Sequence, residues 1–174
     1  MTRKQFAVTI ARVRQELENI GKLLDELAGR DLLAVDEKSG PRLDLPDDSF
    51  CLRSIGSVLH DFYMAVEKIM KAVAKSVDGV VPQGPNWHRE LLVQMTLSVP
   101  QVRPPVISTE TAVVLLEFLA FRHVFRNVYG FGLSAVRLGE LLPKLPGAAK
   151  RLEDEVTRFL AAMEEVLPEG SEAD

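Results

Sequence analysis

The chain has 174 residues, of which 47% are hydrophobic and only 6% aromatic, and its net charge is −4 at pH 7. This length suits one domain with enough apolar material for a core, and the charge argues against broad electrostatic capture of nucleic acid. A single cysteine, Cys51, excludes an intramolecular disulfide and a cysteine zinc cluster. No apolar run reaches the length of a membrane span, and the N-terminal residues lack the apolar core of a signal peptide, so we expect a soluble cytoplasmic protein without membrane contact.

Two long amphipathic helices are expected in the first half of the chain, over residues 3–29 and 49–78. In each, apolar residues recur in alternating steps of four and three, the spacing of a helix that buries one stripe. The two stripes are Phe6, Ile10, Val13, Leu17, Ile20, Leu24 and Leu27, and then Leu52, Ile55, Leu59, Phe62, Val66, Ile69 and Val73. Residues 28–49 are rich in charge, Gly and Pro, which indicates a connector with a short helical turn around Asp31 to Val35. Matching stripes predict antiparallel packing of the two helices.

Three further helices are expected, over residues 87–98, 109–142 and 147–167, followed by a frayed acidic tail at 170–174. Asn86 and Ser108 are residue types that cap helix N-termini, and segments rich in Pro and Gly separate the helices. Gly130 and Gly132 predict a bend or break just after Tyr129. The sequence therefore predicts an all-α antiparallel bundle of about five helices in a single domain, residues 1–174.

The segment at 121–130 separates polar from apolar side chains. On a helix with Arg122 placed at zero, Arg126 lies at about 40°, His123 at about 100°, Asn127 at about 140° and Tyr129 at about −20°. The apolar residues fall on the opposite arc, at roughly 200° to 300°, and they are Phe121, Val124, Phe125 and Val128. The pattern predicts that one face packs in the bundle while the other presents a tight cluster of polar side chains.

The chemistry of this polar face is open to two interpretations. Arginine forks suit phosphate oxygens, and Arg122 and Arg126 lie one helical turn apart, so both can converge on one phosphodiester. His123 can serve as an acid or a base near neutral pH, and Tyr129 adds a hydroxyl. The plainer interpretation is a solvated face of a bundle helix, or the docking face of a non-catalytic interaction module.

Several segments carry a resemblance to one family, in the same order along the chain. They are Leu59-His60-Asp61-Phe62-Tyr63 with Glu67, then Trp87-His88-Arg89-Glu90-Leu91-Leu92, then Arg103-Pro104, and then Phe121-Arg122-His123. Together with the motif that follows, they resemble the HepT-like branch of the HEPN-domain ribonuclease toxins, over about residues 50–140. The signature of that branch reads Arg, four residues, His, one residue, Tyr. Arg122 and Tyr129 supply its first and last positions, and Asn127 stands at the histidine position.

The resemblance implies a HEPN-type bundle that forms a homodimer and places two copies of the motif across a cleft. It implies a metal-independent endoribonuclease without a cofactor, in which Arg122 orients the scissile phosphate and the motif histidine moves protons during attack by the ribose 2′-OH. It also implies an MNT-type minimal nucleotidyltransferase as antitoxin. This partner transfers AMP from ATP to Tyr129, which adds negative charge and bulk where the substrate phosphate is expected.

Asn127 departs from the family pattern, because an amide cannot exchange a proton near neutral pH, although it can still hydrogen-bond a phosphate. Three explanations are open: a natural variant with weak or lost activity, a deliberate exchange of His for Asn that allows a toxic protein to be produced, or transfer of the proton chemistry to His123. The first two are favoured, because His123 is offset from Asn127 by about 40° and one turn along the helix axis.

His60, Glu67 and His88 carry a weaker signal. A metal site built from them is disfavoured against local capping or hydrogen bonding in the core. Trp87 is interpreted as an anchor for the short helix that it begins. Cys51 is interpreted as a small, buried apolar residue rather than a reactive thiol.

Overall fold

The computed structural model describes residues 2–33, 45, 48–127 and 132–166. Within these ranges the chain forms helices and no strand, and its only β-type pairing is an isolated bridge between Val99 and Arg103, which confirms the predicted all-α class. The elements are α1 (Arg3–Ala28), α2 (Ser49–Val73), the π-helical turn η1 (Ala74–Asp78), α3 (Trp87–Thr96), α4 (Thr109–Asn127), α5 (Ala135–Leu141), the 3-10 turn η3 (Leu142–Lys144) and α6 (Leu145–Val166).

The described residues reproduce the five predicted helical segments, with the fourth divided between α4 and α5. The bend predicted after Tyr129 falls in residues 128–131, which lie outside the described residues, as does the predicted acidic tail. The last helix begins at Leu145 rather than at 147. Pro146 is tolerated there because the first turn of a helix does not use its N–H groups for internal hydrogen bonds.

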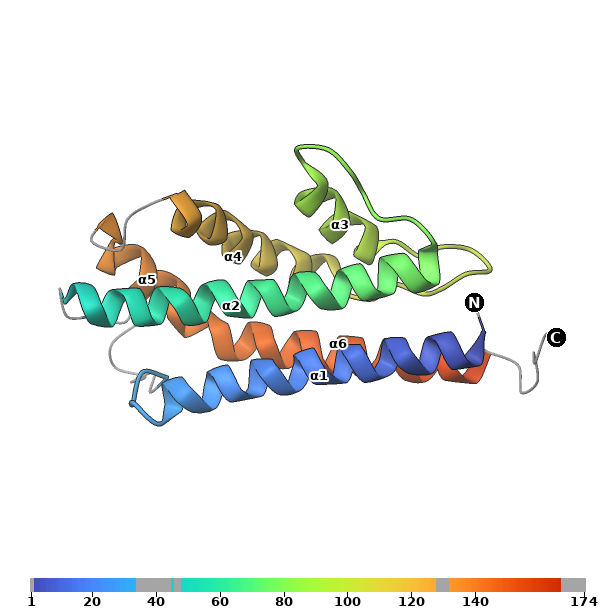
Figure 1. Cartoon of the computed structure of the whole chain (residues 1–174), viewed down its shortest axis with the longest axis horizontal. Coiled ribbons are helices and arrows are strands. Elements are labelled where there is room, and N and C mark those ends of the chain that lie inside the picture. Colours follow the sequence, from blue (N-terminus) through green and yellow to red (C-terminus); the bar gives the residue numbers. More distant parts are fainter. Residues whose placement is uncertain (1, 34–44, 46–47, 128–131, 167–174) are drawn as a thin grey trace.

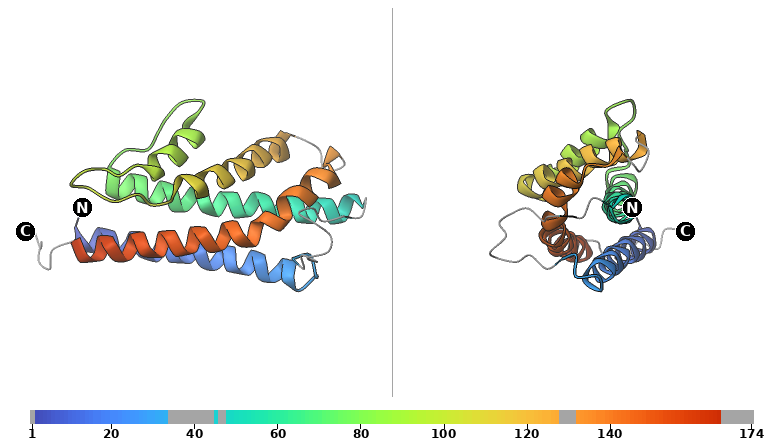
Figure 2. Two further views of the ribbon diagram at one scale, coloured as in Figure 1. Left: turned by 180° about the vertical axis from the view of Figure 1, so that it is seen from behind. Right: turned by 90° about the vertical axis from the view of Figure 1, so that its left-hand side faces the viewer.

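α2 is the central helix of the bundle (Figure 1). α1 and α4 both run antiparallel to it, and α6 runs antiparallel to α1, so that α1 begins and α6 ends at the same end of the molecule. The short helix α3 lies over the C-terminal half of α2 and beside α4, and Figure 2 shows the same arrangement from two other directions. This packing brings α2, α3 and α4 together in one region.

Local signals fix where several helices begin. Thr2 Oγ1 accepts a hydrogen bond from the Gln5 N–H at 3.2 Å, and Gln5 Oε1 accepts one from the Thr2 N–H at 2.9 Å, so α1 starts with a capping box. Ser108 Oγ accepts from the Thr111 N–H at 3.1 Å, as predicted for the start of α4. Asn86 does occupy the N-cap position of α3, but its side chain makes no capping hydrogen bond.

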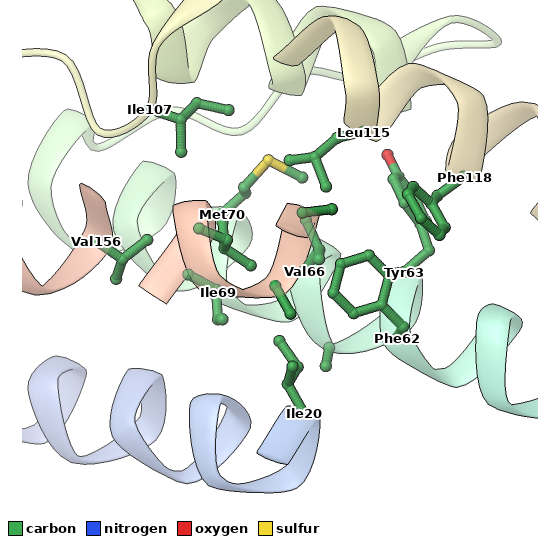
Figure 3. Packing of buried hydrophobic residues seen from close by; sticks show 14 of the residues in the cluster. Ile20, Phe62, Tyr63, Val66, Ile69, Met70, Ile107, Leu115, Phe118 and Val156 are labelled. Carbon is green, nitrogen blue, oxygen red and sulfur yellow. The ribbon is translucent and has the colours of Figure 1, made fainter. Parts of the chain in front are cut away.

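The core is built on the predicted stripe of α2, all seven residues of which are buried. Figure 3 shows Phe62, Val66 and Ile69 of this helix among the residues that the neighbouring helices contribute. The rings of Phe62 and Phe118 meet edge to face with centroids 4.9 Å apart, which joins α2 to α4. On α1 the predicted stripe is buried except at Leu17 and Leu24, which pack against the core while partly exposed.

A buried arginine, Arg103, ties the segment after α3 to the end of η1. Its guanidinium donates to both carboxylate oxygens of Asp78, with a distance of 2.9 Å from Nη2 to Oδ2. It also donates to the backbone carbonyls of Gln94, Leu97 and Pro104 at 2.9 to 3.1 Å. These contacts join the C-terminal end of α3 to the end of η1.

Candidate functional site

The end of α4 places the motif residues in two different environments. Arg122 is only 4% exposed and points into the bundle, whereas His123, Arg126 and Asn127 are exposed. Val124, predicted to pack in the core, is 39% exposed. The predicted division into one polar and one apolar face is therefore wrong at Arg122 and Val124. The reason is that α2 and α3 cover the Arg122 side of α4 and offer polar partners there, which the spacing of residues on α4 cannot show.

Arg122 makes its contacts with α2 and α3. Its Nη1 donates to His88 Nε2 at 3.2 Å, and its Nη2 lies 3.3 Å from Glu67 Oε2. Its Nε lies 3.4 Å from Met64 Sδ, a weak acceptor. The guanidinium is thus held from two helices at once, by one imidazole, one carboxylate and one thioether.

Glu67 lies at the centre of a group that we call the Glu67 cluster: the buried residues Glu67, His88 and Arg122, and Lys71, which is 42% exposed. Lys71 Nζ contacts Oε1 at 2.8 Å, and His88 Nδ1 lies 2.8 Å from Oε2. The second contact is a close approach between the imidazole and the carboxylate rather than an aligned hydrogen bond. One carboxylate faces two permanent cations, so the cluster keeps a net charge of +1 while His88 is neutral.

The partners of His88 define its protonation state. A guanidinium only donates hydrogen bonds, so Nε2 of His88 must accept, and the ring proton belongs on Nδ1, the nitrogen that faces Glu67. Burial lowers the pKa of His88, and this effect, assisted by the Arg122 charge, outweighs the Glu67 carboxylate, which raises it. The ring also stacks on Trp87 with centroids 3.5 Å apart, while Lys71 Nζ lies 4.0 Å from the centre of the Trp87 ring.

Tyr63 borders the cluster and is fully buried beside Phe118 (Figure 3). Its hydroxyl has no hydrogen-bond partner among the described residues. Burial, and secondly the negative charge of Glu67, raise the pKa of Tyr63, so the hydroxyl stays neutral. An unpaired buried hydroxyl is costly, by about 1–3 kcal/mol in mutational data.

One of the exposed motif residues, His123, contacts the Glu67 cluster. The ring of His123 meets that of His88 at 87° with centroids 5.3 Å apart, so an exposed imidazole contacts the buried one. Asn127 Nδ2 donates to the carbonyl of His123 at 2.7 Å, so the amide is bonded to the backbone of its own helix. Arg126 is one turn from Arg122 and exposed. The end of α4 therefore exposes an imidazole, an amide and a guanidinium, and the imidazole contacts the cluster.

A comparison with known protein families identifies the family of this chain. A family profile described as HepT-like protein matches residues 54–163, which is more than half of the chain. The chain belongs to the HepT-like family. The matched range includes every residue of the Glu67 cluster and the whole motif from Arg122 to Tyr129. No curated protein and no solved structure matches the chain.

The structure describes four of the five residues to which the sequence assigned a role in the HepT-like motif. Arg122, His123, Arg126 and Asn127 all lie within α4, and the structure brings them together at its end. Tyr129, the predicted site of AMP transfer, lies outside the described residues. No group of three His, Cys, Asp or Glu side chains in the described ranges is placed to hold a metal ion.

His60, Glu67 and His88 do not form one site. His60 Nδ1 lies 3.2 Å from Asp61 Oδ1, and its ring packs against Phe125 with centroids 5.3 Å apart, whereas Glu67 and His88 contact each other and Arg122.

No helix in the described part of this HepT-like chain has the length and apolar character needed to cross a membrane.

Sequence reasoning missed Glu67, Lys71 and Tyr63 as parts of the site. The available signal was the position of Glu67 on α2, where it is flanked by the buried residues Val66 and Ile69. A carboxylate inside a buried helix requires a cationic partner, and the sequence offers Lys71 one turn along the same helix. Which arginine supplies a second partner depends on the packing of α4 against α2, which is set by tertiary structure.

Proposed function

We propose that this HepT-like protein is the toxin component of a HEPN/MNT toxin–antitoxin pair and that it acts on RNA without a metal ion. The observation that carries the proposal is the family match over residues 54–163, because the matched range contains the motif at the end of α4. RNA supplies its own nucleophile, so such a protein needs only to position the phosphate, transfer protons and stabilise charge. The end of α4 offers groups suited to each of these tasks.

Arg122 is proposed to orient the scissile phosphate. Its side chain is 5% exposed, so a phosphate contacts it along one edge, while His88, Glu67 and Met64 hold the other side. Of its five N–H donors, two make hydrogen bonds within the described residues. The donors that remain, the exposed Arg126 one turn away and the net positive charge of the cluster all favour a phosphodiester at this position.

The proposed reaction is cleavage by the ribose 2′-OH. The 2′-oxygen forms a bond to phosphorus, the bond from phosphorus to the 5′-oxygen breaks, and the products are a 2′,3′-cyclic phosphate and a 5′-hydroxyl. One proton leaves the 2′-OH and one reaches the 5′-oxygen. Asn127 occupies the position from which a histidine would transfer these protons, and its amide can do neither. We therefore propose that this chain binds RNA and cleaves it weakly or not at all.

The proposed partners follow from the same family. Two copies of the chain are proposed to form a homodimer that places two motifs across a cleft. An MNT-type nucleotidyltransferase is proposed to act as antitoxin by transferring AMP to Tyr129, so that a bulky phosphate ester occupies the place of the substrate phosphate.

The decisive experiment restores the family pattern with Asn127→His. Purified chains are incubated with a 5′-labelled oligoribonucleotide in EDTA, and the products are resolved on a sequencing gel. We expect cleavage by Asn127→His at least about tenfold above the unaltered chain, since a positioned acid or base contributes on the order of 10²–10⁴-fold. Asn127→Gln is the matched control without a proton to exchange, and an all-deoxy substrate should stay intact.

Two further variants separate the open explanations. If the unaltered chain cleaves RNA and His123→Ala abolishes that cleavage, then His123 performs the proton chemistry. An RNA ladder that is identical for Asn127→His, Asn127→Gln and the unaltered chain would contradict a ribonuclease function. Arg14→Ala, on the exposed face of α1, serves as the charge-matched control for any arginine variant at the site.

A second candidate function is a non-catalytic module that docks a protein partner. Two observations favour it: Arg122 is ion-paired inside the bundle, and the Asn127 amide is bonded to the backbone carbonyl of His123. Arg122→Ala in the Asn127→His background discriminates the two functions, provided that circular dichroism shows a folded helical protein. Loss of cleavage supports the enzyme, and loss of partner binding alone supports the dock.

A further inference from the structure

We infer that Glu67 and His88 are positioning residues that fix the orientation of the Arg122 guanidinium at the end of α4. The inference rests on the proposed function, because it gives the two residues a part in the contact between Arg122 and a phosphate. Neither residue touches the substrate in this scheme. They act through Arg122, from α2 and from α3 respectively.

Two arginines are buried in the described part of the chain, and they differ in how fully they are bonded there. Both are 4% exposed. Arg103 makes five hydrogen bonds, to Asp78 and to three backbone carbonyls, which use all of its N–H donors. Arg122 makes only two, to His88 and to the weak acceptor of Met64, with one ion pair to Glu67. All N–H donors of Arg103 are thus used within the protein, as in a residue with a structural role. Among the described residues, Arg122 has N–H donors left that can bind a ligand.

The contacts of Arg122 are arranged to set its direction. Nη1 is directed to His88 on α3 and Nη2 to Glu67 on α2, so both the plane and the rotation of the fork are determined. Lys71, one turn along α2, occupies the other carboxylate oxygen and restrains Glu67 itself. The proximity of Glu67 to His88 Nδ1 favours the tautomer in which Nε2 is the acceptor that Arg122 requires.

Stability alone does not account for this cluster. Desolvation offsets much of the attraction in a buried ion pair, and apolar residues of similar volume are often as stable or more so. The neighbouring Tyr63 hydroxyl is left without a partner in the described part of the chain, which adds to the cost. A costly group of charges beneath the motif helix is expected where the placement of one charge matters for function.

The test of the inference compares three substitutions of His88 in the Asn127→His chain. Glutamine can place an acceptor near the position of Nε2, asparagine is too short to do so, and phenylalanine keeps only the ring shape. We expect His88→Gln to retain most of the turnover. We expect His88→Asn and His88→Phe to lose it on the order of 10²-fold in kcat, with a smaller change in KM, as a misplaced positioning group does.

Asp78→Asn provides the matched control, because it weakens the other buried arginine pair of the same region. This variant should lower the melting temperature and leave kcat unchanged at temperatures where the chain is folded. A purely structural role for His88 predicts the same behaviour for His88→Asn. Equal kcat values for His88→Gln, His88→Asn and the parent chain would overturn the inference.

A second readout does not depend on catalysis. Long-range ¹H–¹⁵N spectra of the unaltered chain should show His88 protonated at Nδ1, and the Arg122 side chain should give resolved, slowly rotating N–H signals. Glu67→Gln should broaden or shift the Arg122 signals and leave those of Arg103 in place. If Asn127→His shows no cleavage, the proposed function fails and these spectra alone decide the positioning. Arg122 signals that are unchanged in Glu67→Gln would refute it.

Discussion

At the scale of single residues, burial decides what Arg122, His123 and Asn127 can contribute. Arg122 is held inside the bundle by Glu67 and His88, so its charge is screened little by water but is largely balanced by the carboxylate. His123 is exposed above it and is free to meet a ligand. Asn127 is exposed as well, but its amide is bonded to the backbone of its own helix. A histidine at that position would have a ring in place of the amide and a proton to exchange.

The lowered pKa of His88 predicts how stability depends on pH. In the unfolded chain the imidazole of His88 binds a proton with the ordinary pKa of 6.5, whereas in the folded chain it binds the proton only at lower pH. The free energy of unfolding is therefore highest above pH 6.5 and decreases as the pH falls below this value. Urea denaturation across about pH 5 to 8 should therefore show a midpoint that falls on acidification. Glu67 on α2 and Arg122 and His123 on α4 are the charged or titratable groups that face this ring.

His88→Gln, which removes the titrating ring, should flatten this dependence below pH 6.5. His123→Gln is the control, since it removes an exposed imidazole from the same contact. A midpoint for His88→Gln that follows the parent chain at every pH would show that His88 is not responsible.

At the scale of elements, the approach of α2 to α4 depends on Gly56. A Cβ added at Gly56 would lie 2.7 Å from Cε2 and 3.1 Å from Cδ2 of Phe125, and 3.2 Å from Cδ1 of Leu133. Phe125 follows Arg122 by one turn and also packs against Phe121, with ring centroids 5.7 Å apart. The glycine therefore allows the motif end of α4 to lie against α2.

Gly56→Ala should move Phe125 and destabilise the protein. Overpacking costs about 1–3 kcal/mol, and the helix propensity of alanine returns about 1 kcal/mol, so we expect a net loss of up to about 2 kcal/mol in the free energy of unfolding. Gly21→Ala on α1 is the matched control, because nothing lies within 4 Å of its added Cβ. It should gain about 0.5–1 kcal/mol. Urea denaturation measures the free energy of unfolding of both variants. Equal changes in Gly56→Ala and Gly21→Ala would contradict the close contact between Gly56 and Phe125.

The helices show what the sequence can and cannot predict. The stripes of α1 and α2 were readable because buried residues recur at the helical period, and Ser108 was recognisable as a cap from its residue type. Residues of the motif were likewise found from their spacing on α4. Their environment was not, because the burial of Arg122 depends on α3, which reaches α4 only through tertiary packing. The role of Glu67 was hidden for the same reason, since its partners lie far away in the sequence.

At the scale of the whole molecule, burial decides whether Tyr63, one of the two tyrosines of the chain, is open to a modifying partner. Tyr63 is 0% exposed in the core, and Tyr129 follows the end of α4. An enzyme that transfers AMP needs an accessible hydroxyl, so only Tyr129 is a candidate acceptor under the proposed function. Under the proposed function, the modification would add negative charge three residues after Arg126 in the sequence.

Incubation with the cognate nucleotidyltransferase, ATP and Mg²⁺ should add the mass of one AMP group to the intact chain. Tyr129→Phe should abolish the adduct, and Tyr63→Phe should leave it, with the melting temperature of the latter checked because Tyr63 lies in the core. Intact-mass spectrometry makes the measurement. An adduct that persists in Tyr129→Phe, or none in any chain, would count against modification at this residue.

The residues that contact Arg122 lie far from it in the sequence, and this separation has a consequence while the chain is synthesised on the ribosome. Arg122 is 34 residues beyond His88 and 58 beyond Met64, so the contacts of its guanidinium form only after most of the chain has left the ribosome. Glu67 and Lys71, by contrast, are four residues apart on one helix and can pair as soon as α2 forms. The lysine thus neutralises the carboxylate in the nascent chain until Arg122 arrives. A partly synthesised chain that ends before α4 would therefore lack the Arg122 contacts of the Glu67 cluster.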